Sequence, residues 1–429
     1  MSQPLSAPER AFPNGFLWGT ASSSHQVEGG NDANDWSDWE QTPGRITGDG
    51  RAGHACDWWT KGRAEADLSL SHELGHSAHR LSLEWSRLEP EEGTFDQVAF
   101  ARYAQLLEHM RSLGMSAMVT LHHFSLPRWV ARAGGWADPQ TVQRFVRFAE
   151  RAARELGHLV HSWVTLNEPS VQIMQGYFVG VWPPGLKDPV LGMRAFGHLL
   201  LGHARVYARL HALGIARVGI VLNAPLFEAS RPSHVLDRGI TWLQDFAFTG
   251  AAVHALRTGW LLPPLSLVPR HSAEIARSLD FVGLNYYGRY AVRFATQRAD
   301  RLFGVHVQRP SVSTETSDWG AVCGRGLELQ LLRLKELGVP LYVTENGTCD
   351  PDDSARTAYI REHLSAVHNA IAAGADVRGY FHWSLLDNFE WAEGYAVRFG
   401  LIGVDFETQA RRVRDSAHAY AEICRRNAL

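Results

Sequence analysis

The segment Val339–Gly347 reads VPLYVTENG, a short apolar run that ends in a glutamate and is followed at once by Asn-Gly. The run predicts a buried β-strand and Asn-Gly predicts a turn, which places Glu345 at the end of the strand. Removing a carboxylate from water is costly unless partners compensate, so a buried glutamate in this position commonly serves chemistry. The alternative is a glutamate that simply faces solvent at the end of its strand.

Glu168 stands in a matching context, because residues 163–169 read WVTLNEP and again end an apolar run in a carboxylate. Runs of this kind recur along the chain, separated by segments whose apolar residues repeat with helical spacing. The eight predicted strands are residues 16–20, 78–83, 115–121, 162–166, 217–222, 280–284, 340–344 and 377–383. Helices are predicted between them, among others at residues 100–113, 139–156, 191–213, 326–337 and 355–373.

Several of the predicted helices end in a glycine just before the next strand. These glycines are Gly75, Gly114, Gly157, Gly214, Gly338 and Gly374. Glycine takes the left-handed position after a helix at no steric cost. Eight strands alternating with helices in one continuous chain favour a closed (β/α)8 TIM barrel, an α/β fold, over an open doubly wound sheet. We expect residues 1–429 to form a single catalytic domain, with residues 1–11 as a flexible N-terminal extension.

The composition excludes several classes of protein. The formal net charge of −3 leaves no electrostatic footprint for nucleic acid or an anionic membrane. Four cysteines without C-x-x-C spacing predict ordinary thiols rather than disulfides or a zinc site. The first residues lack the apolar core of a signal peptide, and no apolar run is long enough to span a membrane. We therefore expect a cytoplasmic protein, and nothing in the sequence specifies an oligomeric state.

Polar residues follow the predicted strands rather than precede them. They include Arg80, His123, Glu168, Asn223, Asn285, Tyr287, Glu345 and Trp383. In a barrel these strand ends converge on one face, where barrel enzymes keep their active sites. Long loops after the first, sixth and eighth strands, at residues 21–59, 286–325 and 385–408, are expected to wall the pocket.

Glu168 and Glu345 would face each other across the mouth of such a barrel. Two carboxylates about 5–5.5 Å apart are the apparatus of a retaining glycosidase, and about 6.5–9.5 Å marks an inverting one. The sequence leaves that choice open, and it also leaves open a metal-dependent barrel hydrolase. A further motif, HELGH at residues 72–76, matches the H-E-x-x-H zinc signature. Because Gly75 predicts the end of the helix, we expect His76 to lie off it and the match to be coincidental.

Five blocks now carry a family resemblance: FPNGFLWGTASSSHQVEGG at 12–30, TLNEP at 165–169, NYY at 285–287, VTENG at 343–347 and HWSLLDNFEWAEGY at 382–395. In this order they are similar to the motif set of glycoside hydrolase family 1, the β-glucosidases and their relatives. The resemblance spans nearly the whole chain. It implies a retaining exo-β-glycosidase, most nearly a β-glucosidase with β-galactosidase and β-fucosidase side activities.

The resemblance also implies residue roles, with Glu168 as general acid/base and Glu345 as nucleophile. Arg80 and Tyr287 would stand beside Glu345 and keep it ionised, while the charge of Glu345 would keep Glu168 protonated. Sugar contacts would come from Gln26, His123, Asn167, Asn285, Glu390 and Trp391, with Trp383 as a stacking platform. The implied partners are small-molecule β-glycosides and short oligosaccharides, with no cofactor and no metal.

Two blocks depart from the family pattern. The usual YHWDLP stands here as HHFSLP at residues 122–127, so Phe124 replaces a tryptophan and Ser125 an aspartate. Residues 80–87 read RLSLEWSR rather than the commoner RFSISWPR. These changes leave the aglycone contacts and minor sugar contacts open. Relatives that act on 6-phosphorylated sugars carry serine in place of Glu390, whose charge would repel a phosphate. A catalytically silent sugar-binding barrel is a second alternative, although such relatives typically lose one of the two glutamates.

Overall fold

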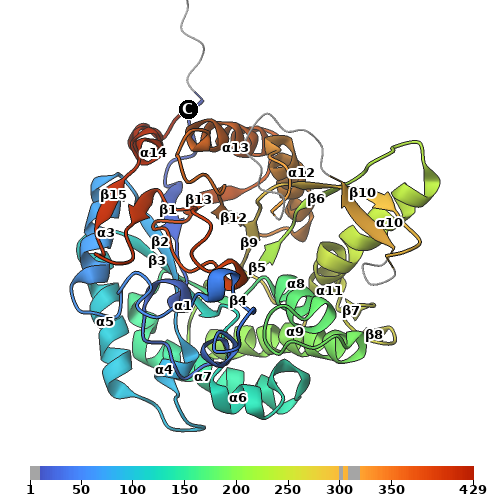
Figure 1. The fold of residues 1–429 in the computed structure, drawn as a ribbon, viewed down its shortest axis with the longest axis horizontal. Coiled ribbons are helices and arrows are strands. Elements are labelled where there is room, and N and C mark those ends of the chain that lie inside the picture. The colour runs from blue at the N-terminus through green and yellow to red at the C-terminus, as the bar shows by residue number, and fades with distance from the viewer. Residues whose placement is uncertain (1–9, 299–302, 308–318) are drawn as a thin grey trace, which may run out of the picture.

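All eight predicted strands form, and they close into a parallel barrel (Figure 1). The structure is a computed structural model that describes residues 10–298, 303–307 and 319–429. The barrel strands are β1 (Leu17–Ala21), β2 (Ala78–Ser82), β3 (Ser116–His122), β4 (Ser162–Asn167), β5 (Val218–Asn223), β9 (Phe281–Asn285), β12 (Leu341–Asn346) and β13 (Val377–Trp383). Each pairs with its neighbours in chain order, and β13 pairs back onto β1 from Leu17↔Gly379 to Ala21↔Trp383.

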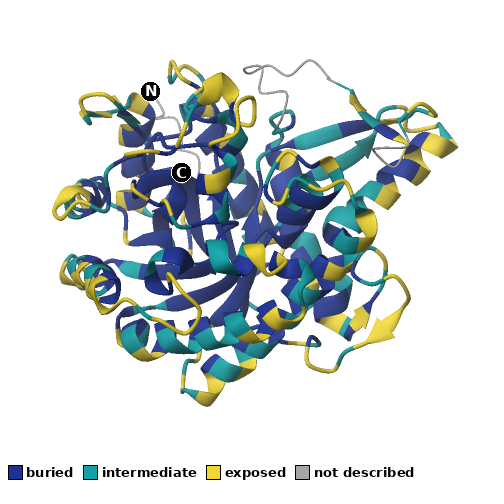
Figure 2. Ribbon diagram, turned by 60° about the horizontal axis from the view of Figure 1, so that its bottom comes forward, coloured by how far each residue is buried: buried dark blue, intermediate teal, exposed yellow. Residues whose placement is uncertain are grey.

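Strands buried on both faces explain why the sequence predicts them well. Nearly every barrel-strand residue is buried, inside by other strands and outside by helices, so the strands read as continuous apolar runs. Figure 2 shows this as dark strands within a ring of helices whose exposed residues face outward. The longer helices are α3 (Arg63–Glu73), α5 (Gln97–Ser112), α7 (Gln140–Leu156), α9 (Pro189–Ala212), α10 (Val235–Asp245), α11 (Ala251–Thr258), α12 (Gly324–Leu334), α13 (Arg356–Ala372) and α14 (Asp415–Arg426).

Five of the six glycines predicted to end helices take positive φ, from +71° at Gly338 to +86° at Gly75. At Gly157 the α-helix also ends as predicted, after Leu156, but the glycine does not take the left-handed conformation. Its φ is −57°, and it continues α7 into a 3-10 turn over Gly157–Leu159. A turn that tightens in this way satisfies the last carbonyls without a left-handed residue.

Shorter elements lie in the connections between the barrel strands and the longer helices. The short helices are α1 (Ser24–Val27), α2 (Asp35–Trp39), α4 (Trp85–Leu88), α6 (Arg128–Arg132) and α8 (Pro169–Ile173). The small strands are β6 (Leu226–Ala229), β7 (Trp260–Leu261), β8 (Arg270–His271), β10 (Arg289–Phe294), β11 (Gly304–Val307), β14 (Ile402–Val404) and β15 (Arg411–Val413). Strands β6 and β10 continue the parallel pairing of β5 and β9 beyond the barrel, and with β11 and α10 they form the lobe at the right of Figure 1.

The structure describes the predicted long loops to different extents. Loops 21–59 and 385–408 meet through Trp36 and Trp391, whose ring centroids are 4.6 Å apart. Within loop 286–325, residues 299–302 and 308–318 lie outside the described residues. The expected extension at 1–11 is described only at Arg10 and Ala11, and Ala11 forms a bridge with Ala428.

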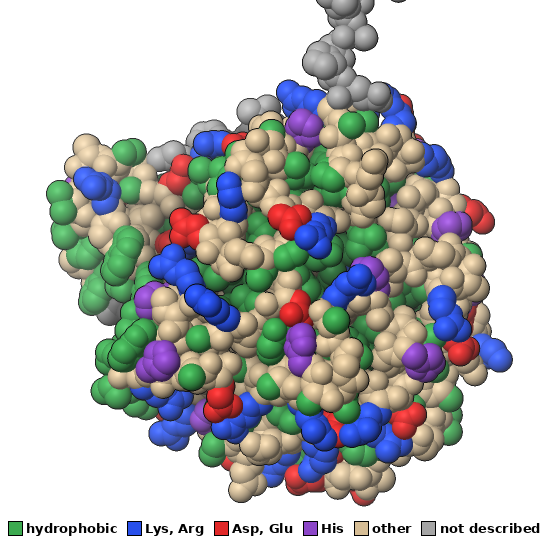
Figure 3. All heavy atoms as spheres, turned by 180° about the vertical axis from the view of Figure 1, so that it is seen from behind, with side chains coloured by type: hydrophobic (Ala, Val, Ile, Leu, Met, Phe, Trp, Pro, Cys, Tyr) green, Lys and Arg blue, Asp and Glu red, His purple; other side chains and the backbone are tan. Residues whose placement is uncertain are grey.

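The outer surface carries mixed charge. Seen from behind, basic, acidic and hydrophobic side chains are interspersed (Figure 3), as a nearly balanced chain predicts. All four cysteines are free thiols. Among the helices that the structure describes, none has the length and apolarity needed to cross a membrane.

Candidate active site

Glu345 lies at the end of β12, buried in the mouth of the barrel with 3% of its surface exposed. Each of its carboxylate oxygens has a donor. Arg80 donates from Nη1 to Oε1 at 2.5 Å, and Tyr287 donates from its hydroxyl to Oε2 at 2.6 Å. Burial, and then the charge of Glu345, raises the pKa of Tyr287 well above its usual value, so the phenol stays a donor. The two predicted partners of Glu345 are therefore the ones the structure brings to it.

Arg80 is fully buried on β2 and ties the two predicted catalytic strands together. Its Nη2 donates to Asn167 Oδ1 at 2.6 Å, and its Nε donates to Thr120 Oγ1 at 3.2 Å. A rigid guanidinium with several donors suits this bridging position. The charge of Glu345 is thus balanced by a cation that cannot be displaced without breaking contacts to two other strands.

Glu168 follows β4 in a left-handed backbone conformation, with φ +46° and ψ +57°. Non-glycine residues seldom adopt this region, and those that do cluster at functional sites. Pro169, which begins α8, fixes the chain directly after it. Burial, and then the charge of Glu345, raises the pKa of Glu168 to about 8. The sequence predicted the direction of this shift from Glu345 alone, but burial is the larger cause.

The two oxygens of Glu168 have different surroundings. Oε1 accepts from Asn285 Nδ2 at 2.7 Å and from Asn223 Nδ2 at 2.8 Å. Oε2 accepts no hydrogen bond from any residue of the described ranges. An amide donor favours the unprotonated oxygen, so a proton on this carboxyl group belongs on Oε2.

Asn285 on β9 is oriented by its neighbours. Thr344 donates to its Oδ1 at 2.7 Å, so its Nδ2 points toward Glu168 and toward Asn167 Oδ1, 3.2 Å away. The register places Asn285 directly beside Glu345. A hydrogen-bonded chain consequently runs from Glu345 through Arg80, Asn167 and Asn285 to Glu168.

A second group of predicted residues gathers around Glu390. Trp383 donates from Nε1 to Glu390 Oε1 at 3.0 Å, and Gln26 donates to Oε2 at 3.1 Å. The Gln26 amide is fixed further, because it also donates to Asn388 and accepts from Ser23 at 2.6 Å. Burial raises the pKa of Glu390 to about 8, with a smaller contribution from Glu345. Three of the predicted sugar-binding residues therefore form one cluster at the ends of β1 and β13.

His123 has a ring N–H donor to which the described residues offer no acceptor. Asn167 Oδ1 already accepts from Arg80, so its Nδ2 is the donor that faces His123 Nε2 at 3.2 Å. Burial lowers the pKa of His123 well below its usual value, so the ring is neutral and its proton sits on Nδ1. Nδ1 is buried and has no partner among the described residues. A buried unpaired donor is costly, which favours a ligand hydroxyl as its partner.

Trp391 closes the site from the loop after β13. Its ring lies 5.3 Å from Phe124, 5.7 Å from His25 and 6.1 Å from His123. Trp182 adds a further ring at 5.9 Å. These aromatic faces form the kind of wall that suits a sugar ring.

Three residues that contact the site were not foreseen from the sequence. Asn223 was recognised as a polar strand end without a role, and Ser23 and Asn388 were not singled out. The contact of Asn223 could have been predicted, because β5 lies next to β4 in any barrel of this order. The last residue of β5 must therefore approach Glu168. For Ser23 and Asn388 no local signal existed, since both act only through the amide of Gln26.

The H-E-x-x-H match is not a metal site. Helix α3 ends at Glu73 as predicted, and His76 is buried against Ser71 at 2.7 Å while His72 is exposed. Nowhere in the described part of the chain do three or more His, Cys, Asp or Glu side chains form a group that could hold a metal ion.

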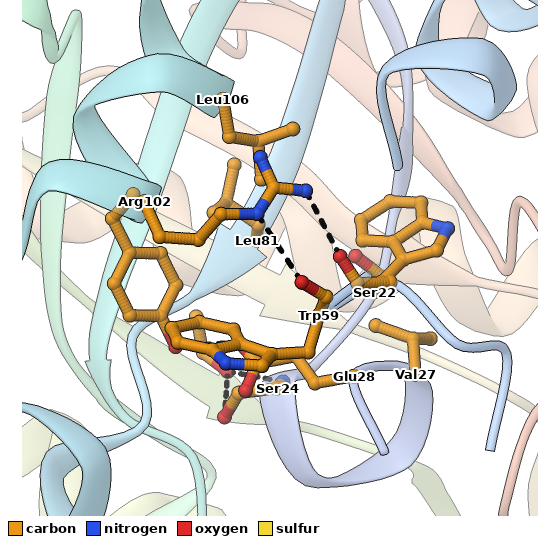
Figure 4. Close-up of a pocket in the computed structure, with 11 residues that line it drawn as sticks. Ser22, Ser24, Val27, Glu28, Trp59, Leu81, Arg102 and Leu106 are labelled. Carbon is orange, nitrogen blue, oxygen red and sulfur yellow. Dashed lines mark hydrogen bonds between the residues drawn. The ribbon is translucent and has the colours of Figure 1, made fainter. Parts of the chain in front are cut away.

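A separate small cavity lies between the loop after β1 and helix α5 (Figure 4). Its volume of about 10 Å³ has room for about one water molecule. Arg102 lines it and donates to the carbonyl oxygens of Trp58 and Trp59, and Glu28 also lines it. This cavity is too small for a sugar and is independent of the two carboxylates.

Comparison with known proteins shows the family to which the chain belongs. The model of glycosyl hydrolase family 1 matches residues 8–429. β-Glucosidase A of Thermotoga maritima is 32% identical, over 98% of this chain and 99% of its own length. Two similar solved structures are a β-glycosidase from Pyrococcus horikoshii (TM-score 0.89, 36% identity, 98% of this chain and 96% of that one) and the T. maritima β-glucosidase in complex with glucoimidazole (TM-score 0.91, 32% identity, 98% and 100%). The chain belongs to glycosyl hydrolase family 1 and is a β-glycosidase with the (β/α)8 barrel of that family.

Proposed function

We propose that this chain is a retaining, exo-acting β-glucosidase that removes terminal non-reducing β-linked glucose, with β-galactosides and β-fucosides as minor substrates. The observation that carries the proposal is the hydrogen-bonded chain that links Glu345 and Glu168 across the barrel mouth. Glu345 has a cation and a phenol as partners, whereas Glu168 is buried and its Oε2 accepts no hydrogen bond from the described residues. The matched β-glucosidases support glucose as the main sugar.

In the first step, Glu345 attacks the anomeric carbon and forms an ester bond as the glycosidic C–O bond breaks. The leaving-group oxygen takes the proton from Oε2 of Glu168. Forming the ester removes the charge of Glu345, so Glu168 then holds a proton less tightly. In the second step Oε2 accepts a proton from water, the water oxygen bonds to the anomeric carbon, and the ester bond to Glu345 breaks.

The remaining predicted residues hold the sugar. His123 Nδ1 would donate to a sugar hydroxyl, and Glu390 and Gln26 would bind two others while Trp383 lies against the ring face. Asn167 and Asn285 would act chiefly through protein contacts, with Asn167 also near the 2-hydroxyl. Trp391 would close the pocket.

The tests for nucleophile and acid/base use the stereochemistry of azide rescue. Glu345→Gly should lose nearly all turnover of a nitrophenyl β-glucoside, and azide should restore part of it by yielding the α-glucosyl azide through a single inverting displacement. Glu168→Ala should keep activity on substrates with activated leaving groups and lose activity on those without. With azide it should yield the β-glucosyl azide through the glycosyl-enzyme. Products of the opposite configuration would reverse the two assignments.

Two alternatives have their own discriminating results. A catalytically silent sugar-binding barrel would bind a nitrophenyl β-glucoside without saturable hydrolysis. A 6-phospho-β-glycosidase would prefer the phosphorylated glucoside, which the buried carboxyl group of Glu390 disfavours. We further propose that residues 1–429 act as one catalytic domain in the cytoplasm, without a cofactor, on small β-glycosides and short oligosaccharides.

A further inference from the structure

Glu84, at the end of β2, is a buried carboxylate that the mechanism above does not use. None of its surface is exposed. Its Oε2 accepts from the hydroxyls of Ser125 at 2.9 Å and Ser24 at 3.1 Å. Its Oε1 accepts from Ser86 at 2.7 Å and from Asn34 Nδ2 at 3.3 Å. One side chain thus joins segments that lie far apart in the sequence.

These four donors are neutral, and the described residues form no ion pair with Glu84. A buried carboxylate is tolerated only when its oxygens are well supplied with hydrogen bonds. The dependence is mutual, because removing the carboxylate would leave the hydroxyls of Ser24 and Ser125 without this acceptor. The group is therefore a fixed point of the fold rather than a solvated charge.

Three of these positions, 84, 86 and 125, are among those at which the chain departs from the commoner family pattern. That pattern has serine at position 84 and aspartate at position 125, whereas this chain has Glu84 and Ser125. The structure now shows that the two side chains touch. In this chain the carboxylate stands at position 84 and the hydroxyl at position 125, the reverse of that pattern, and the two are joined by one hydrogen bond.

The two hydroxyls held by Oε2 belong to segments that carry proposed sugar contacts. Ser24 begins α1, a single turn that includes Gln26, and the residue before this turn provides no side-chain cap. Ser125 lies two residues after His123, and its backbone N–H donates to the His123 carbonyl oxygen at 3.0 Å. Between them, Phe124 has φ +72°, so this short turn is held in an uncommon conformation.

We propose that Glu84 is a positioning residue that holds Gln26 and His123 at the sugar through Ser24 and Ser125, and that its exchange with position 125 preserves this function. The proposal rests on the proposed function, since it takes Gln26 and His123 as sugar contacts. Glu84 itself does not touch the sugar.

The test is reciprocal exchange. Glu84→Ser should lower kcat/KM for a nitrophenyl β-glucoside about 10–100-fold, the range expected for losing hydrogen bonds to a charged group. Ser125→Asp alone should also lower kcat/KM, because it sets a second carboxylate against Glu84. The double variant restores one carboxylate and one hydroxyl, and should recover about 10-fold or more of the loss in Glu84→Ser.

Thermal unfolding of each variant shows whether the barrel is intact. If Glu84→Ser does not fold, Glu84→Gln, which keeps one acceptor oxygen, replaces it in the kinetic test. A folded Glu84→Ser or Glu84→Gln with kcat/KM unchanged would overturn the proposal, as would a double variant no better than Glu84→Ser.

The variant Gln26→Ala tests the sugar contact of Gln26 separately from the positioning role of Glu84. In that background Glu84→Ser should cost much less than in the parent, because part of its effect acts through Gln26. Full additivity would contradict positioning. If Gln26→Ala itself left kcat/KM unchanged, the sugar contact in the proposed function would be refuted and the positioning role with it. A loss in Gln26→Ala without one in Glu84→Ser refutes the positioning role alone.

Discussion

Asn223 gives the sharpest prediction, because it is one of only two donors that the described residues supply to Glu168. Asn223→Ala removes the 2.8 Å hydrogen bond to Oε1, which favours the ionised carboxylate. Its loss should therefore raise the pKa of Glu168 above the present value of about 8. The basic limb of kcat/KM against pH, which reports the free enzyme's acid, should move upward.

The size of the shift follows from the hydrogen bond. A bond to a charged group contributes about 1.5–3 kcal/mol when it is sheltered, but Asn223 is half-buried and water can replace part of it. We take about 0.7–1.4 kcal/mol, which corresponds to roughly 0.5–1 pH unit. A substrate with a poor leaving group is required, since only then does the first step depend on the acid.

The control is the same substitution in a Glu168→Ala background assayed with azide, where the titrating group is absent and the pH profile should not move. Asn223→Asp extends the series, because an added negative charge near Oε1 should shift the limb further upward. A basic limb that stays in place or moves downward in Asn223→Ala would refute the assignment of the proton to Oε2.

Three further predictions concern the nucleophile, the backbone and acid stability. Tyr287→Phe removes the 2.6 Å donor to Glu345 and should lower kcat/KM about 10–100-fold with little change in thermal stability; an equal loss of stability would indicate a packing role instead. Gly114→Ala, at φ +72° with open space around it, should destabilise the fold by about 1 kcal/mol, whereas Gly239→Ala in exposed helix α10 should stabilise it by about 0.5–1 kcal/mol. Burial lowers the pKa of His203 to about 4, so the unfolded chain binds more protons below pH 6.5, and the free energy of unfolding should fall by up to about 1.4 kcal/mol per pH unit from pH 6.5 to about 4. His203→Gln should flatten that slope in urea titrations, and an unchanged slope would contradict it.

The barrel could be predicted because its signals are local. Each central strand is buried on both faces and therefore reads as an apolar run, and most helix ends are marked by glycine. Gly157 marks a helix end as well, but a 3-10 turn follows there and no positive φ is needed. The lobe of β6, β10 and β11 was not predicted, since its half-buried strands lack the continuous apolar character of the barrel.

The candidate site was predictable as a set of positions, because strand order alone brings Glu168, Glu345, Arg80 and Tyr287 to one face. What the sequence could not give is which oxygen each donor meets. The unequal oxygens of Glu168 depend on the exact register of β5 and β9. The hydrogen bonds of Glu84 could not be predicted either, because its partners at positions 24, 34 and 125 become neighbours only in three dimensions.

The closing pair β1 and β13 joins residues that are hundreds of positions apart, from Leu17↔Gly379 to Ala21↔Trp383. As the chain leaves the ribosome, β1 must keep one edge unpaired until almost the whole protein has been made. An unpaired apolar strand edge is a template for wrong association, so newly made chains should be most prone to aggregate late in synthesis. Chains stalled before residue 379 should therefore recruit chaperones, and release of the last fifty residues should end that dependence.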